Sequence, residues 1–216
     1  MKTFWMRGGA LPVLAALIAV AVPCLAQAAL FGQVSTAYPL EKGTNDVGGF
    51  VSVFENSTLI FGQYRHGLFS NADCGVQAGF VDPEGGDMGL AIGADAKFLV
   101  LPLSNDMPFD LALDPRISYM NESAFSIVSL GGSVVISRDY ALAQGSIAPY
   151  GALNMRLDNV HYDGRDLGPG VDNNNTDFNI SGIAGVKWDA SQLIDILGEV
   201  VFDENLGVTI GLNFKI

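Results

Sequence analysis

The chain has 216 residues, of which 49% are hydrophobic and 16% are charged, and its formal net charge is −12 at pH 7. Because a strongly acidic protein repels phosphate backbones, nucleic acid is excluded as an expected partner. The abundance of apolar residues excludes an intrinsically disordered chain.

Residues 1–28 have the three zones of a secretory signal peptide. Lys2 and Arg7 supply the positive start, residues 10–22 form the apolar zone, and Ala26-Gln27-Ala28 offers a small-x-small cleavage site. The apolar zone is shorter than the ~20 residues that a membrane-spanning helix needs. We therefore expect export and cleavage of the leader after its last residue.

The two cysteines bear on processing and redox state. Acylation of Cys24 is the alternative to simple cleavage, and Pro23 in front of it disfavours that reaction. Once the leader is removed, Cys74 is the only cysteine, so no intramolecular disulfide is expected. Its neighbours of the same parity are apolar, which predicts that it acts as a small hydrophobe and not as a reactive thiol.

Residues 29–44 are expected to be a periplasmic lead-in to the first strand. Leu30 to Tyr38 alternates only weakly between apolar and polar residues, and Pro39 interrupts it. From residue 45 to 216, short alternating segments are separated by clusters of Gly, Asn, Asp, Ser and Pro, which is typical of an all-β domain.

Ten strands are expected in this domain, each of about the 9–11 residues that a tilted strand needs to cross a bilayer. The predicted ranges are 45–54, 58–66, 73–81, 88–101, 109–120, 124–137, 147–160, 176–189, 193–203 and 206–216. The longest insertion, 161–175, is polar and rich in Gly and Asn. Because the lead-in is uncertain, counts from eight to twelve stay open.

The last segment, Leu206 to Ile216, alternates cleanly: Val208, Ile210, Leu212, Phe214 and Ile216 share one face. It resembles the C-terminal signal strand of bacterial outer-membrane β-barrels. In that family an aromatic is most often the last residue, whereas Phe214 is third from the end. The resemblance implies an antiparallel up-and-down transmembrane β-barrel, closed on itself and located in the outer membrane. It also implies contact with outer-membrane lipid and lipopolysaccharide, and recognition of 206–216 by the barrel-assembly machinery.

Charged and polar residues occur in the middle of the predicted strands, on the face opposite to the apolar residues. In a membrane barrel they must point into the lumen, because a charge that faces hydrocarbon costs about 2–4 kcal/mol at the midplane. The predicted lumen-lining residues are Asp95, Lys97, Asp110, Asp114, Arg116, Asn154, Arg156, Asp158, Lys187, Glu199 and Asp203. In a soluble β-sandwich the same residues would lie on an exposed sheet face.

Aromatic residues fall near strand ends on the apolar parity, as in the interfacial girdles of a membrane barrel. They are Tyr64, Phe80, Phe98, Phe109, Tyr119, Phe178, Trp188, Phe202 and Phe214. A sandwich core would instead gather them at mid-strand, so the pattern favours the barrel.

Motifs for catalysis are scarce. The sequence has no phosphate loop, no paired-cysteine metal spacing and no HExxH, so we expect no enzyme activity, no cofactor and no metal site. A membrane-embedded hydrolase is the alternative, and His161, close in sequence to Asp158 and Asp163, is its candidate base. Residues 172–177 carry several oxygen ligands for calcium but lack the glycine and glutamate of an EF-hand loop.

Two main functions stay open for a non-enzymatic barrel. One is a narrow, mildly cation-preferring channel for small solutes, and the other is a structural or binding barrel whose lumen is filled by ion pairs. Because ten strands leave little room inside, a filled or very narrow lumen is favoured. A soluble periplasmic carrier, sandwich-like or lipocalin-like, is the alternative outside the membrane.

Overall fold

The computed structural model describes residues 31–104, 107–122, 125–162, 174–203 and 205–216. The predicted leader, 1–28, lies outside these residues. The described strands are β1 (Asn45–Val53), β2 (Ser57–Phe69), β3 (Ala72–Pro83), β4 (Gly89–Leu101), β5 (Asp110–Asn121), β6 (Phe125–Ser137), β7 (Tyr140–Ala141), β8 (Ser146–Tyr162), β9 (Asn174–Asp189), β10 (Ile194–Phe202) and β11 (Leu206–Lys215).

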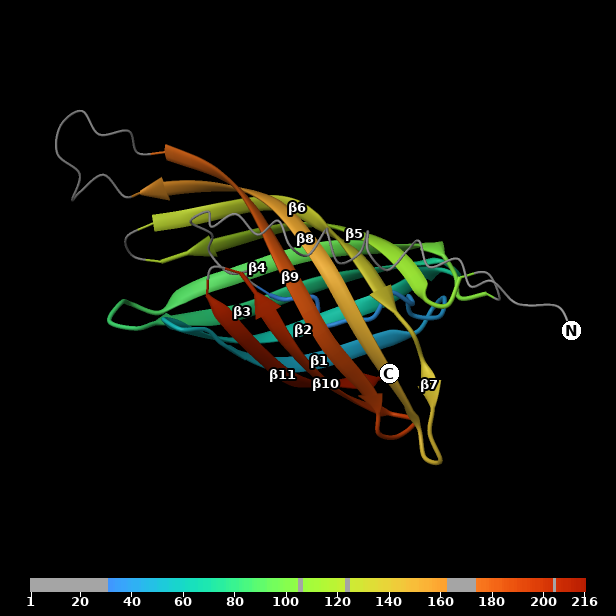
Figure 1. Ribbon diagram of the computed structural model, residues 1–216. Coiled ribbons are helices and arrows are strands. Elements are labelled where there is room, and N and C mark those ends of the chain that lie inside the picture. The colour runs from blue at the N-terminus through green and yellow to red at the C-terminus, as the bar shows by residue number, and fades with distance from the viewer. Residues whose placement is uncertain (1–30, 105–106, 123–124, 163–173, 204) are drawn as a thin grey trace, which may run out of the picture.

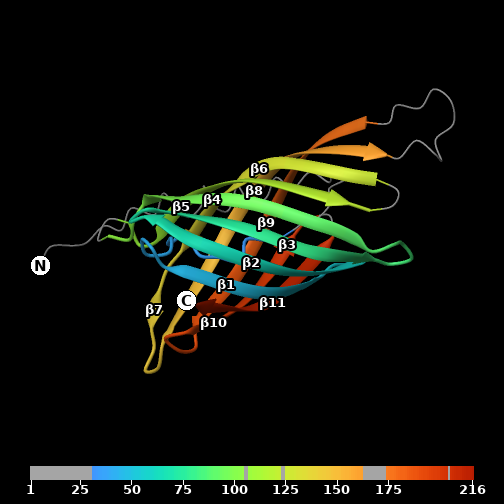
Figure 2. The same cartoon turned by 180° about the vertical axis from the view of Figure 1, so that it is seen from behind.

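Ten of these strands form a closed antiparallel barrel (Figures 1 and 2). Each strand pairs with its neighbours in the chain, and the ring is closed where β1 pairs with β11. The short β7 pairs only with the start of β8, and β6 pairs directly with β8. The predicted fold class and the ten predicted strands are confirmed, and β7 is an addition inside the expected 138–146 connection. No helix of the described residues is long and apolar enough to cross a membrane.

The barrel has two different ends. At the termini end, Asn45 and Ile216 exchange backbone hydrogen bonds of 2.8 and 3.3 Å. The hairpin of β7 and β8 projects past the other turns at this end (Figures 1 and 2). The loop end holds the β1–β2, β3–β4, β5–β6 and β10–β11 turns and the far ends of β8 and β9. We call the two parts of the interior the termini half and the loop half. Most of the predicted 161–175 insertion, 163–173, lies outside the described residues.

The outer face of the barrel is apolar. Among the described strand residues, the outward-facing positions carry a single charged side chain, Asp82, at the loop end of β3. At mid-strand, Ile60, Leu130 and Ile210 are 60–62% exposed. Outward aromatics form one row near the termini end, with Tyr64, Phe98, Trp188 and Phe214, and another near the loop end, with Phe80, Tyr119, Phe178 and Phe202. Phe109 differs from the prediction, since it precedes β5 and is half-buried.

The inner face is polar in the termini half, whereas in the loop half it is mostly apolar and carries one ion cluster, Arg156, Asp158 and Asp203. Inward side chains of the loop half form one cluster: Phe50, Leu59, Phe61, Val81, Ala91, Met120, Ile127 and Val160. This distribution is the reverse of that in a soluble barrel, whose outer face is polar and whose interior is apolar throughout.

The segment before β1 enters the barrel. Residues 31–37 are all buried, and residues 38–44 connect them to β1 at the termini end. Phe31 packs edge-on against Phe61 of β2, with ring centroids 5.2 Å apart, and Phe61 stacks on Phe50 of β1 at 5.0 Å. The described part of the expected lead-in is therefore largely an internal segment. We call residues 31–37 the lumen segment.

Candidate functional site

The lumen segment is held by backbone hydrogen bonds to barrel-wall carboxylates. The amides of Gln33 and Val34 donate to Glu199 of β10, at 3.1 Å to Oε1 and 2.9 Å to Oε2. Tyr150 of β8 donates its hydroxyl to the same carboxylate at 2.8 Å. Because Glu199 is only 3% exposed, these donors replace the water that its charge would otherwise need.

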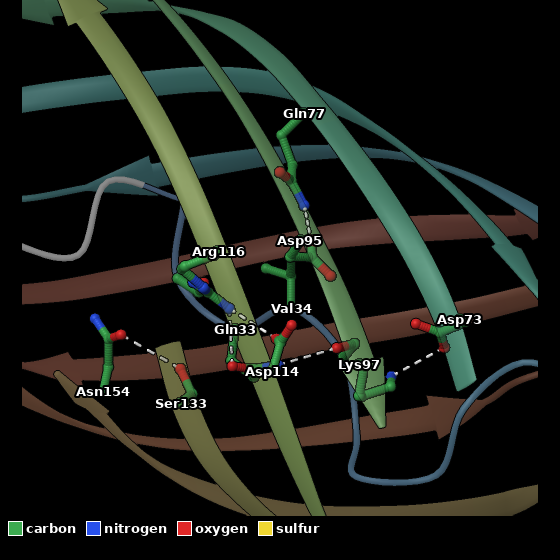
Figure 3. Close-up of polar contacts among 12 residues, drawn as sticks. Gln33, Val34, Asp73, Gln77, Asp95, Lys97, Asp114, Arg116, Ser133 and Asn154 are labelled. Atoms are coloured by element: carbon green, nitrogen blue, oxygen red, sulfur yellow. Dashed lines mark hydrogen bonds and ion pairs between the residues drawn. The ribbon is translucent and has the colours of Figure 1, made fainter. Parts of the chain in front are cut away.

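The opposite wall holds the same segment through Arg116 and Asp114 of β5 (Figure 3). Arg116 donates to the carbonyl of Gly32 at 2.5 Å and to Asp114 at 3.0 Å, and Gln33 Nε2 donates to Asp114 at 2.7 Å. The segment thus bridges β10 and β5 across the interior.

Gly32 is required for this bridge. Its φ is +66°, a conformation that L side chains rarely adopt. A Cβ at this position would also collide with the Glu199 carboxylate. Any larger residue at this position would displace the segment from the wall.

Further contacts follow the chain toward the termini end. The Ala37 amide donates to Ser137 Oγ of β6 at 3.1 Å, and the Leu40 amide donates to Asp73 of β3 at 2.9 Å. The lumen segment is therefore fixed to β5, β6 and β10, and the chain that follows it is fixed to β3.

A four-residue ion network lies on one side of the termini half, and Figure 3 shows three of its members, Asp73, Asp95 and Lys97. Arg65 of β2 contacts Asp73 of β3 at 2.5 Å and Asp95 of β4 at 2.6 Å. Lys97 of β4 contacts the second oxygen of Asp73 at 3.2 Å. Both cations are only 2% exposed. Ions of opposite sign on adjacent strands thus neutralise one another inside the barrel.

Two other ion clusters lie on the opposite wall. Arg156 of β8 contacts Asp158 at 2.7 Å and Asp203, beyond β10, at 3.2 Å. At the termini mouth, Lys215 lies 2.8 Å from Asp195 and 3.3 Å from Asp189, and Lys187 lies 3.1 Å from Asp189. Because the inward residues carry charges of both signs, Arg156, Lys187 and Lys215 each form an ion pair with a carboxylate.

All of the predicted lumen residues lie on inward positions of their strands or, for Asp203, just past the end of β10. Arg116, Lys187 and Asp203 are half-buried, and the others are buried. The structure brings together Asp114, Arg116 and Glu199 through the lumen segment, and Asn154 with Ser133 at 3.4 Å. Asp110 is separate from these groups and accepts the Leu103 amide at 2.7 Å.

Sequence reasoning missed Arg65, Asp73 and Gln33. Arg65 and Asp73 sit on the polar parity of β2 and β3, opposite Tyr64 and Val76, so the alternation could have found them. Nothing in the weak alternation of 30–38 indicated that Gln33 would lie inside.

The two described residues of the candidate hydrolase site, Asp158 and His161, do not face each other. Alternation along β8 places Asp158 inside the barrel and His161 outside, where Nδ1 lies 2.6 Å from Asn174 Oδ1. Asp163 and the first two residues of the calcium candidate, 172–173, lie outside the described residues. Within the described ranges, no group of three or more His, Cys, Asp and Glu side chains is arranged to hold a metal ion.

A cavity of about 240 Å³ occupies the loop half. Its walls are apolar and include Leu59, Val81, Met120 and Ile127, while its floor includes Phe31 of the lumen segment together with Arg116 and Arg156. Glu122, in the β5–β6 turn, also lines it, and burial raises the pKa of this carboxyl above its ordinary value.

An apolar outer wall, two aromatic rows and an ionic interior together define the architecture. The fold is that of a small outer-membrane-type β-barrel. No family model matches the chain, and a search of curated proteins finds no match.

Solved structures of low identity share this shape. The chain is similar to the N-terminal β-barrel domain of Pseudomonas aeruginosa OprF, with 9% identity over 82% of this chain and 100% of that chain, at a TM-score of 0.40. It is also similar to the KdgM porin, with 9% identity, 78% and 98% coverage and a TM-score of 0.41. A de novo designed transmembrane β-barrel matches with 15% identity, 82% and 99% coverage and a TM-score of 0.35.

Proposed function

We propose that the protein is a non-enzymatic outer-membrane barrel of the structural or binding kind, with a lumen closed by its own chain. The observation that carries the proposal is the lumen segment, buried inside the ring and hydrogen-bonded to β5, β6 and β10. A solute that entered from the loop end would meet Phe31, Gln33 and Val34 before it reached the termini end.

Hydrogen bonds hold the lumen segment at one position inside the barrel. Glu199 receives hydrogen bonds from two backbone amides and one hydroxyl, and charge-assisted bonds of this kind contribute about 1.5–3 kcal/mol each. Removal of the segment would leave Glu199, Asp114 and Arg116 with fewer partners in a confined interior. These costs favour the closed state over an open channel.

The proposed location is the outer membrane, reached through cleavage of the leader at 28. The apolar wall would contact lipid tails, and the loop end would face lipopolysaccharide. Strand β11 closes the ring against β1 and places Phe214 outward at 46% exposure, as the proposed assembly strand requires. Detergent-dependent extraction, together with the mass of the mature chain, tests the location and the cleavage.

Planar-bilayer conductance tests the closed lumen. We expect the folded wild-type protein to give no steady current steps, and we expect Glu199→Ala to give salt-dependent steps, because it loses the carboxylate that holds Gln33 and Val34. Thr209→Val is the matched control, since Thr209 pairs across from Glu199 on β11 and bonds to Ser52 instead, at 2.7 Å. Steady steps from the wild type would support the narrow channel and contradict the closed barrel.

A further inference from the structure

The cavity of the loop half combines mostly apolar walls with a polar floor, and its loop end carries Asn56, Glu122 and Asn205. Leu59, Val81 and Ile127 are each at most 5% exposed, and Met120 is 8% exposed. Phe54 and Phe125 also line the cavity near its loop end. A site that is apolar along its sides and polar at one end suits a molecule with the same two parts.

The size of the cavity limits that molecule. An engineered apolar cavity of about 150 Å³ binds benzene. At about 240 Å³, this cavity has room for a bicyclic or short-chain molecule of roughly ten non-hydrogen atoms. A long acyl chain or an oligosaccharide is too large for it.

Two hydrogen-bond donors at the floor have no partner among the described residues. Arg156 is 7% exposed, and within the described residues its Nη2 has no hydrogen-bond partner. Arg116 Nε is also without a partner among these residues, as is the acceptor Asp158 Oδ1. A buried donor without a partner is unfavourable, so a ligand that accepts a hydrogen bond at this floor gains free energy.

The charges of the floor are already matched. Arg116 pairs with Asp114, Arg156 pairs with Asp158 and Asp203, and Asp95 pairs with Arg65. An anion would approach Asp95, Asp158 and Glu122, and a cation would approach the two guanidinium groups. Either one would also lose its hydration, and at the floor neither would gain an unused counter-ion, because Glu122 lies in the β5–β6 turn at the loop end. The matched floor therefore favours an uncharged occupant.

We infer that this cavity binds a small uncharged amphipathic molecule, with its apolar body against the loop-half walls and a hydroxyl or carbonyl at the Arg116–Arg156 floor. The inference rests on the proposed closed lumen, because Phe31 of the lumen segment forms part of the floor. It adds a ligand class to the binding role.

Methionine NMR of the mature chain in lipid nanodiscs tests this binding. The probes are three naphthalenes of the same shape: 2-naphthylmethanol, 2-naphthoate and 2-naphthylmethylammonium. Labelled Met120 reports on the cavity, whereas Met155 faces outward at 39% exposure and reports on partition into lipid. We expect 2-naphthylmethanol to shift Met120 saturably and to leave Met155 without a saturable shift. The two charged probes should bind at least about tenfold more weakly, a difference of about 1.4 kcal/mol.

A matched pair of variants on β6 locates the site. Ser129→Phe places a ring inside the cavity and should weaken binding of 2-naphthylmethanol by about tenfold or more, whereas Ser126→Phe faces outward and should change it less than about twofold. If a variant fails to fold, the comparison of the three probes on the wild-type protein still tests the inference.

Three outcomes would overturn the inference: no saturable shift of Met120 with any probe, equal shifts of Met120 and Met155, or a charged probe that binds as tightly as the alcohol. Conductance separates these outcomes from failure of the proposed function. A silent barrel without a Met120 response overturns the ligand inference alone, whereas a conducting wild type overturns the closed lumen itself.

Discussion

The two halves of the lumen use the same ten strands and are filled in different ways. In the termini half, Arg65 and Lys97 are buried against Asp73 and Asp95, and the chain that follows the lumen segment packs beside them. In the loop half, apolar side chains line the walls and a cavity separates them. Long ionic side chains that pair across the interior fill the first half. In the second half the ion cluster of Arg156, Asp158 and Asp203 stays on one side, and the remaining, mostly apolar walls leave a cavity.

This difference suggests that the two halves of the lumen have different roles. We propose that the ion-paired half closes the barrel and that the more apolar half holds the ligand. The lumen segment is the boundary, since it bonds to charged residues below and presents Phe31 to the cavity above. The following predictions change one half or its surroundings and leave the other intact.

The largest effect is expected from Arg65→Met in the termini half. The change leaves Asp73 with Lys97 and Asp95 with Gln77, in a site where the arginine is 2% exposed. Removing one partner of a buried ion pair costs about 3–5 kcal/mol, and we expect that loss in the free energy of unfolding measured by urea titration in lipid.

The control for this loss is Arg138→Met. Arg138 is exposed and lies over the Tyr140 ring at 5.2 Å, so its removal should cost no more than about 1 kcal/mol. Equal losses in the two variants would mean that the buried network is not what stabilises the termini half.

An intermediate effect is expected from a charge placed on the outer wall. Leu130→Arg, at mid-strand in β6, should destabilise the lipid-folded barrel by about 2–4 kcal/mol, and Leu206→Arg, at the loop end of β11, by about 0–1 kcal/mol. The two leucines are 60% and 59% exposed, so a protein in water would tolerate both changes alike. Equal losses of unfolding free energy in lipid for the two variants would contradict a bilayer around the middle of the barrel.

The smallest effect is expected from two substitutions that compare the free space in the two halves. Ser137→Phe enlarges a buried side chain that accepts the Ala37 amide, and overpacking of this kind costs about 1–3 kcal/mol. Ser129→Phe, on the same strand and face, enters the cavity and should cost less than about 1 kcal/mol. Similar costs from urea titration of both variants would contradict the contrast between a packed half and a hollow half.

The fold was predictable because alternation sets both strands and faces. Residues such as Asp114 and Arg116 had to point inward once Leu113 and Ile117 pointed outward. The final strand likewise alternates because one of its faces is on the outer wall and the other is in the interior. The predicted strand ranges differ from the observed ones mainly at their ends, where turn residues such as Phe109 leave the ladder.

The closure of the lumen was less predictable. Residues 31–37 form no strand, so no periodicity marks them, and their partners Glu199 and Ser137 are distant in sequence. The cavity likewise depends on how far inward side chains reach across the ring, which a single sequence does not specify. A filled lumen was predicted from ion pairs, but the chain segment inside it was not.

Thiol accessibility tests the placement of the lumen segment most directly. In a Cys74→Ala background, Ser35→Cys and Tyr38→Cys would be treated with a membrane-impermeant thiol reagent in lipid-folded protein. Ser35 is 7% exposed and Tyr38 is 49% exposed, so we predict that the first cysteine reacts more than about tenfold more slowly. Equal rates at the two positions would place the segment outside the barrel and contradict the closed lumen.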